Sequence, residues 1–187
     1  MPFLIEQNDL EIEKFTSFQM ILKDNIGDDG CCFYKAVSLY FDLVGVVDSE
    51  QYGPDALRSQ IANTLKNYGC FLCYCGISWE KYISSKYKQS ISAFEESIRS
   101  GDAFVTDLEL KILSVCLQVN VHVFVEESKF IYKRCCSFEI LGATEEQTIR
   151  LVRSTNRPER FKAMVRRKLV SYSFIHLYSL YYFIMFY

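Results

Sequence analysis

The sequence predicts an α+β domain, in which helices drawn mostly from the first two thirds of the chain pack against a sheet built mostly from the last third. Apolar residues recur with helical spacing between residues 33 and 115, and they alternate as in a strand from residue 119 onward. The chain has 187 residues, of which 50% are hydrophobic, so it can form one compact domain with a substantial core. Helices followed by strands favour the α+β class.

The first two predicted helices follow a polar segment. Residues 1–17 are mixed in character and predict an N-terminal extension with at most a short helix, while residues 18–168 are expected to form the domain. Pro54 suits the first turn of a helix, because the N–H group that it lacks would have no partner there. The apolar faces of the two helices contain Phe33, Ala36, Val37, Tyr40 and Val44, and then Leu57, Ile61, Leu65 and Tyr68.

The later part of the chain changes from helices to strands. After a Cys-rich bend at residues 69–78, helices are predicted over residues 79–87 and 91–99. Thr106 and Glu109 form a T-x-x-E capping box, which is typical of the start of another helix. The strands are predicted at residues 119–125, 130–132 and 148–152.

The composition excludes several classes of protein. Charged residues make up 24% of the chain and the formal net charge is -2, so the chain is neither disordered nor globally suited to nucleic acid. The N-terminus has early acids and no basic segment, which is not typical of a secretory signal. We therefore expect the eight cysteines to be thiols in a reducing compartment, the cytoplasm. There is no phosphate-binding glycine loop, and we expect no cofactor.

The stretch DDGCCFYKAVSLYF (residues 28–41) places two thiols where a helix is predicted to begin. The first turn of a helix presents unpaired N–H groups and the positive end of the helix dipole, which favour the reactive thiolate form of a cysteine. The same N–H groups, with those of the preceding loop at Gly30, suit a developing oxyanion. The alternative is a small cysteine buried at a helix start, because a cysteine nucleophile also needs a base elsewhere.

Three blocks of the sequence resemble the ovarian tumour (OTU) family of cysteine proteases. Residues 29–38 (DGCCFYKAVS) resemble the family signature D-G-x-C-[FL]-[FY]-[RK]-A-[VI]-S. Residues 57–65 resemble its L-R-x-x-I-A helix. Residues 101–125 resemble its E-L-x-x-L-A segment and the strand that follows, although the family's Trp-Gly pair is absent.

The resemblance implies a papain-like OTU fold, with a mixed central sheet packed by helices, and a deubiquitinase. OTU enzymes hydrolyse the isopeptide bond after the C-terminal glycine of ubiquitin or a ubiquitin-like protein, so such a modifier is the implied partner. By position, Cys32 corresponds to the nucleophile and Asp29 to the acidic residue of the motif. The N–H groups of Gly30 and Cys31 would border the oxyanion hole. The resemblance implies no metal.

The family's general base, a His in an H-[YF] pair, has no counterpart at the matching places. Arg160 and Tyr181 stand where that His could align. Arginine stays protonated, and a phenol is a poor base at neutral pH. Of the two histidines, His122 lies inside a predicted strand, and His176 is a possible base only in an unusual register. We therefore expect a weak or inactive protease that acts by binding ubiquitin. The alternative is an active deubiquitinase that uses Cys32 and an unrecognised base.

The C-terminal segment raises another alternative. Residues 169–187 (LVSYSFIHLYSLYYFIMFY) carry no formal charge and follow a basic flank, as in a tail anchor on a membrane that faces the cytoplasm. Three Ser and five Tyr make the segment only modestly hydrophobic, so a final strand or an unrelated tail also fits. The basic stretch at residues 150–168 fits a solvated surface better than a nucleic-acid site. The Cys-rich bend lacks the spacing of a zinc site.

Overall fold

The computed structural model describes residues 4–7, 12–14, 20–23, 31–44, 49–70, 73–74, 76–101, 105–129, 131–156 and 161–166. The strands in this part of the chain are β1 (Leu4–Gln7), β2 (Ile12–Lys14), β3 (Met20–Lys23), β4 (Cys73–Tyr74), β5 (Ile77–Ser78), β6 (Asn120–Ser128), β7 (Ile131–Ile140), β8 (Thr148–Arg153) and β9 (Phe161–Arg166). The helices are α1 (Cys32–Val44), α2 (Ser49–Tyr52), α3 (Pro54–Tyr68), α4 (Trp79–Tyr87), α5 (Ile91–Ser100) and α6 (Asp107–Leu117), with a 3-10 turn, η1, at Glu145–Gln147.

The main sheet of the described residues is mixed, as the resemblance implies. Its strand order is β1-β7-β6-β8-β9-β3, and β2 also pairs with β7. Strands β6 and β8 run parallel, in a register that pairs Asn120 with Thr148 and Val125 with Arg153, whereas the other pairs are antiparallel. The α+β prediction is therefore confirmed.

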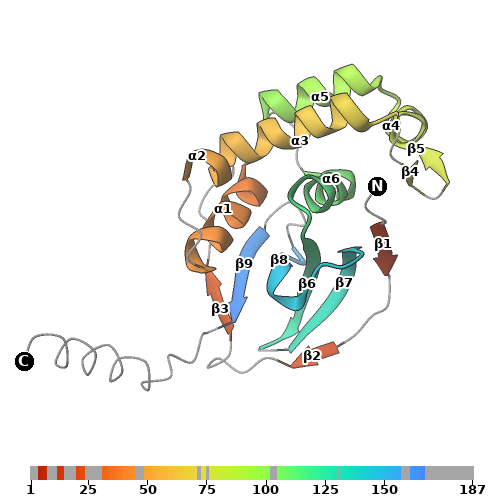
Figure 1. Cartoon of the computed structure of the whole chain (residues 1–187). Helices are drawn as coiled ribbons and strands as arrows, with labels where there is room; N and C mark the ends of the chain where they lie inside the picture. Colours follow the sequence, from red (N-terminus) through yellow and green to blue (C-terminus); the bar gives the residue numbers. More distant parts are fainter. Residues whose placement is uncertain are drawn as a thin grey trace, which may run out of the picture.

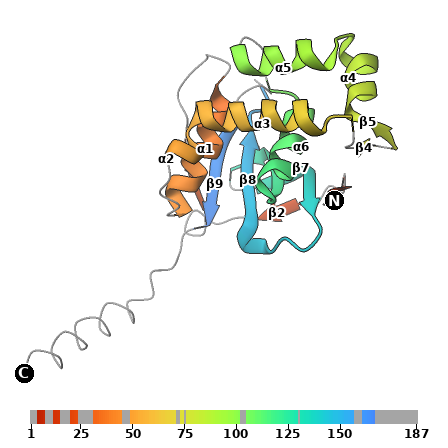
Figure 2. The same ribbon diagram turned by 45° about the horizontal axis from the view of Figure 1, so that its top comes forward.

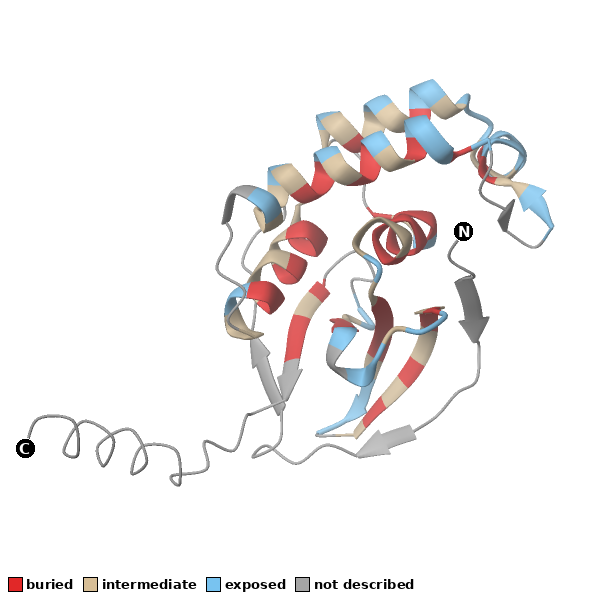
Figure 3. Cartoon of the chain, viewed as in Figure 1, coloured by how far each residue is buried: buried red, intermediate tan, exposed pale blue. Residues whose placement is uncertain are grey.

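The helices cover one face of the sheet and form the main core with it (Figure 1). Helix α1 packs against β9 and β8, and α6 packs against β7 and β6. Helix α3 lies across α1 and α6 and also contacts α5, so it forms a second helical layer (Figures 1 and 2). Buried residues line the inner sides of α1, α3 and α6, while the outer sides of α3 and α5 are largely exposed (Figure 3).

The predicted apolar faces of α1 and α3 are confirmed except at one residue. Phe33, Ala36 and Val37 are fully buried in the main core, as is Leu57 at the start of α3. Pro54 stands in the first turn of α3, where its missing N–H group costs nothing. Tyr68, in contrast, is the last residue of α3 and is 56% exposed. The prediction for Tyr68 was therefore wrong.

The N-terminal residues form strands where the sequence allowed a short helix. The described parts of residues 1–17 are β1 and β2, and both pair antiparallel with β7. Each segment is too short and too mixed in character for its apolar residues to show a helical or strand repeat. The edge of β7 decides its conformation, because it supplies partners for backbone hydrogen bonds. The Cys-rich bend contains the small β4–β5 hairpin, in which Gly76 takes the left-handed conformation that a tight turn requires.

Among the described residues, none of the helices combines the length and the apolar character that a membrane crossing requires. The segment at residues 169–187, for which a membrane anchor was an alternative, lies outside the described residues.

Candidate active site

Cys32 is the first residue of α1, so the predicted helix start at this thiol is confirmed. Its side chain is only 4% exposed and packs into the main core beside α1's other inward-facing residues. Cys31 precedes the helix and is half-buried, and its carbonyl accepts the N–H of Lys35 at 2.9 Å as the first turn closes. Asp29 and Gly30, the predicted acidic and oxyanion residues, lie outside the described residues.

Arg58 of α3 holds the side chain of Cys31 in place. Its Nη2 donates a hydrogen bond to Cys31 Sγ at 2.6 Å, and the guanidinium lies over the Tyr34 ring at 5.0 Å. Arg58 is 9% exposed, and its other partner, Asp55, lies 3.5 Å away in solvent. Burial alone would lower the pKa of Arg58, but the hydrogen bond and charge interaction with Cys31 raise it. The guanidinium is therefore a fixed positive charge beside Cys31, the residue that precedes the candidate nucleophile.

A buried carboxylate connects this cluster to α6. The Tyr34 hydroxyl donates to Glu109 Oε1 at 2.8 Å, and the N–H of Thr106 donates to Glu109 Oε2 at 2.7 Å, which confirms the predicted capping box. Burial raises the pKa of Glu109, since a charged carboxylate is costly at 4% exposure. Burial raises the pKa of Tyr34 as well, so this hydroxyl remains a donor.

Gly101 gives the Arg58 guanidinium its space. A Cβ built on Gly101 would meet Arg58 Cζ at 2.9 Å, closer than a real Cβ approaches another atom. Gly101 also has φ +74°, as the left-handed residue that ends α5. The cluster of Cys31, Tyr34, Arg58 and Glu109, supported by Gly101, therefore joins the start of α1 to α3, α6 and the end of α5.

The start of β9 lies beside the start of α1. The rings of Phe33 and Phe161 meet edge to face with centroids 5.4 Å apart, and Phe161 is 1% exposed. Phe33 follows Cys32, and Phe161 follows Arg160, one of the two residues with which the family His is expected from the sequence to align. Arg160 itself, Tyr181 and His176 lie outside the described residues.

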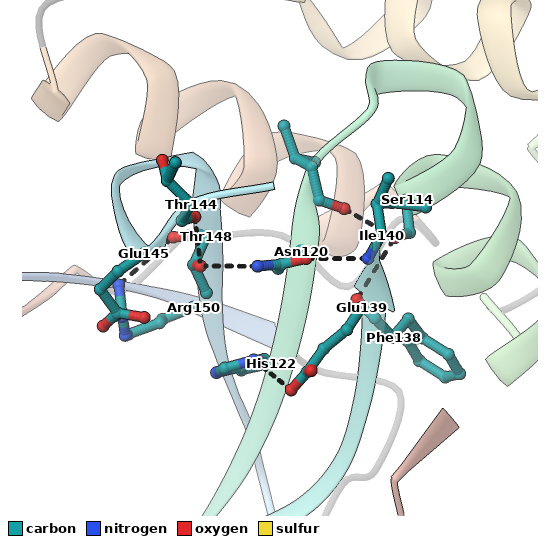
Figure 4. A network of polar contacts seen from close by, with 11 residues as sticks. Ser114, Asn120, His122, Phe138, Glu139, Ile140, Thr144, Glu145, Thr148 and Arg150 are labelled. Carbon is teal, nitrogen blue, oxygen red and sulfur yellow. Dashed lines mark hydrogen bonds and ion pairs between the residues drawn. The ribbon is translucent and has the colours of Figure 1, made fainter. Parts of the chain in front are cut away.

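His122 faces away from Cys32. Residues alternate along β6, and Val121 and Val123 face the main core with α1, whereas Phe124 belongs to a separate small cluster with Tyr132, Val152 and Met164. His122 shares this second face, with its Nε2 3.5 Å from Glu139 Oε1 (Figure 4). Its pKa is lowered to about 4, first by burial and then by Arg134 and Arg150. These guanidiniums and burial outweigh the carboxylate, so His122 is a neutral residue of the sheet.

A polar network at one end of the sheet keeps α6, β6, β7 and β8 in register (Figure 4). The side chain of Asn120 accepts the N–H of Ile140 at 2.9 Å and donates to Thr148 Oγ1 at 3.3 Å. Ser114 of α6 donates to the carbonyl of Val119 at 2.6 Å and contacts that of Phe138 at 3.3 Å. These bonds satisfy buried polar groups. The hydroxyl of Tyr40 on α1 also donates to the carbonyl of Thr148 at 2.7 Å, so the network reaches the helix that begins with Cys32.

Sequence reasoning predicted that a helix starts at Cys32, but it missed the cluster of Cys31, Tyr34, Arg58 and Glu109. Arg58 was visible only as one letter of a helix motif, and Glu109 only as half of a capping box and the first letter of the E-L-x-x-L-A segment. Neither pattern indicates that the two side chains meet Tyr34, which is 24 residues from Arg58 and 75 from Glu109 in the chain. Within the described ranges, no three His, Cys, Asp or Glu side chains gather as metal ligands would.

The comparisons with known proteins agree on one family. The family model described as OTU-like cysteine protease matches residues 27–181. Among solved structures, an OTU domain from Hazara virus, bound to ubiquitin, is 13% identical with a TM-score of 0.61, and the match covers 88% of this chain and 91% of that one.

Two further structures show the same fold. An OTU deubiquitinase from Wolbachia pipientis wMel is 13% identical with a TM-score of 0.58, covering 82% of this chain and 91% of the other. The OTU protease of Qalyub virus is 12% identical with a TM-score of 0.57, covering 88% and 99%. A comparison of the sequence with curated proteins gives no match. Because the family model covers most of its length, this chain belongs to the OTU-like cysteine protease family.

Proposed function

We propose that this domain is directed at ubiquitin or a ubiquitin-like modifier, that it acts mainly by binding the modifier, and that Cys32 is a weak or silent nucleophile. One observation carries the proposal. Cys32 starts α1, as a nucleophile of this family should. Phe161, which begins β9, packs against Phe33 beside it, but the residue before Phe161 is Arg160 and not a histidine.

The chemistry explains why this substitution matters. Cleavage would require the Cys32 thiolate to attack the modifier's C-terminal carbonyl, release an amine, and leave a thioester that water hydrolyses. A base must take the thiol proton and return it to the amine. A guanidinium carries out neither step, although its charge favours a thiolate. The loss of one member of a catalytic triad costs on the order of 10⁴–10⁶ in rate. The burial of Cys32, at 4% exposure, further restricts access to the thiol.

The proposed partner follows from the shared fold. The Hazara virus OTU domain was solved bound to ubiquitin, and so was the Wolbachia pipientis enzyme, whose bound form has a TM-score of 0.54 to this chain. These facts belong to those proteins. They support ubiquitin as the first modifier to test here, because the chain covers nearly the whole fold in each case.

A ubiquitin probe with a C-terminal electrophile tests the proposal. We expect non-covalent binding of ubiquitin to the full chain, slow capture that disappears in Cys32→Ala and persists in Cys31→Ala, and no turnover of di-ubiquitin. Turnover that is lost in Cys32→Ala would establish the active alternative, and His176→Ala would then test the remaining candidate base. Absence of both binding and capture would overturn the ubiquitin assignment.

A gain-of-function variant tests the missing base directly. Arg160→His is expected to raise the rate of capture at least about tenfold, since a restored general base contributes roughly 10²–10⁴ in related chemistry. Arg160→Gln removes the same charge without supplying an imidazole and serves as the control. Equal rates in the two variants would exclude position 160 and leave Tyr181→His as the corresponding test.

We also propose a cytoplasmic location, with attachment to a membrane through residues 169–187 as the alternative. The uncharged length of this segment and its basic flank support the alternative. Recovery of the full chain in carbonate-washed membranes, and its loss when residues 169–187 are deleted, would establish attachment. Recovery only in the soluble fraction would exclude it.

A further inference from the structure

A second pair of adjacent cysteines, Cys135 and Cys136, lies in the middle of β7. In a regular strand, neighbouring side chains point to opposite faces of the sheet. Here the register slips, because Val123 pairs with Cys136 while the next residue, Phe124, pairs with Arg134. Cys135 is therefore the additional residue of a β-bulge. Both thiols are half-buried and both pack against the main core, so they share one face of the sheet.

The surroundings of the pair favour a negative charge on one sulfur. The interaction with the Cys136 side chain lowers the pKa of Cys135 to about 7, an effect that exceeds the opposing effect of burial. The nearby Arg153 guanidinium lowers the pKa of Cys135 further, and its Nε is buried with no hydrogen-bond partner among the described residues. The same interaction, with burial, raises the pKa of Cys136. In the structure the Cys135 thiol donates to the carbonyl of Val123 at 3.2 Å.

Arg153 is held in position by the start of α6 and by β9. Its Nη2 donates to Asp107 Oδ1 at 3.0 Å, and its guanidinium lies over the Phe161 ring at 5.1 Å. The Asp107 carboxylate raises the pKa of Cys135, but its effect is smaller than the lowering effect of Arg153. Two adjacent thiols on one face of a sheet, beside a fixed cation, form the arrangement of a reactive dithiol.

We propose that Cys135 and Cys136 form a peroxide-sensitive dithiol, in which Cys135 is the attacking thiol and Cys136 the resolving thiol. This modification site is independent of Cys32 and of ubiquitin. The Cys135 thiolate attacks one oxygen of hydrogen peroxide, the O–O bond breaks, and the released hydroxide takes a proton to become water. The sulfur, now a sulfenic acid, has lost two electrons to the peroxide. The Cys136 sulfur then attacks it, an S–S bond forms, the S–O bond breaks, and the second oxygen leaves as water with the Cys136 proton.

The product would be easily reduced again. Neighbouring Cα atoms across a trans peptide are about 3.8 Å apart, below the range of about 4.4–6.8 Å that is usual for a disulfide. A bond between adjacent cysteines is therefore strained, and strained disulfides have more oxidising potentials. Oxidation at this site is expected to be reversible by a small dithiol.

Peptide mapping of the full chain tests the proposal. Trypsin releases residues 135–150, which contain these two cysteines alone, and residues 112–129, which contain only Cys116. Cys116 is the internal control, because burial raises its pKa. The chain is treated with one equivalent of peroxide at pH 7 and then alkylated. Peptide 135–150 is expected to lack two hydrogens and to carry no alkyl group. Its oxidation should be at least about tenfold faster than any oxidation of Cys116. Dithiothreitol should restore double alkylation.

The variants assign the two roles. In Cys136→Ser, a sulfenic acid should accumulate at Cys135 and be trapped by dimedone. In Cys135→Ser, residue 136 should remain reduced. Arg153→Gln should slow the reaction several-fold, whereas Arg153→Lys should retain more of the rate. Three outcomes would each overturn the proposal: full alkylation of peptide 135–150 under these conditions, equal oxidation of Cys116, or further oxidation of Cys135 beside a free Cys136. All three can be measured on the unvaried chain.

Discussion

The chain contains the dipeptide Cys-Cys twice, and the two copies have closely similar surroundings. Cys31 contacts Arg58, which lies over the Tyr34 ring at 5.0 Å and reaches Asp55 at 3.5 Å. The second pair lies near Arg153, which covers the Phe161 ring at 5.1 Å and reaches Asp107 at 3.0 Å. Each site thus combines thiols, a guanidinium, an aromatic ring and an aspartate.

The backbone makes the two sites different. At the helix start the two thiols are separated, so Cys32 is buried in the core while Cys31 remains half-buried against Arg58. At the β-bulge both thiols stay on one face, and each shifts the pKa of the other. The comparison teaches that the local backbone decides whether adjacent cysteines act separately or as a coupled pair. The variants below test this comparison, in order of decreasing expected effect.

Phe161 links the two sites, since it packs on Phe33 and lies under Arg153. Phe161→Ala is expected to lower the free energy of unfolding by about 3–5 kcal/mol, because it leaves a cavity at a residue that is 1% exposed. Urea unfolding followed by circular dichroism measures this, with Phe161→Leu as the milder control. A loss below about 1 kcal/mol would show that the two sites are structurally independent.

The two arginines should differ in their contribution to stability. Arg58→Met is expected to cost about 2 kcal/mol, since it removes a charge-assisted hydrogen bond from a side chain that is 11% exposed. Arg153→Met is expected to cost at most about 1 kcal/mol, because its ion pair with the half-exposed Asp107 is screened by solvent. Equal losses in matched urea titrations would contradict the asymmetry between the sites.

The pH dependence of stability should come from His122, which belongs to neither site. Its pKa in the folded chain, about 4, lies below its ordinary value of 6.5. Its contribution is therefore fully present above about pH 6.5 and is lost as the pH falls toward about 4. When the pH falls from 7.5 to 4.5, the free energy of unfolding of His122→Gln should decrease by about 2 kcal/mol less than that of the unvaried chain. Glu109, with its raised pKa, acts in the opposite direction in both proteins. Parallel pH profiles would refute the assignment.

Gly101→Ala should also produce a small effect, about 1 kcal/mol, through its left-handed conformation and the approach to Arg58. Combining it with Arg58→Met separates the two causes. The steric part should vanish in the double variant, so that the two losses are less than additive. Thermal unfolding of the four proteins measures this coupling, and strict additivity would show that Gly101 does not limit the position of the guanidinium.

The sequence by itself determined the features that depend on neighbours in the chain. The apolar periodicity of α1, Pro54 at the start of α3 and the capping box at Thr106 each predict an element correctly, because a helix is specified by contacts three or four residues apart. The position of Cys32 at a helix start was predictable for the same reason.

The tertiary structure alone decided the features that join distant segments. It turned the first residues into strands on β7, brought Arg58 to Cys31 and Tyr34 to Glu109, and placed Phe161 beside Phe33. It also placed the bulge at Cys135, since a bulge exists only relative to the register of the neighbouring strand. No local pattern specifies these contacts, because each is fixed by the packing of whole helices and strands around the core.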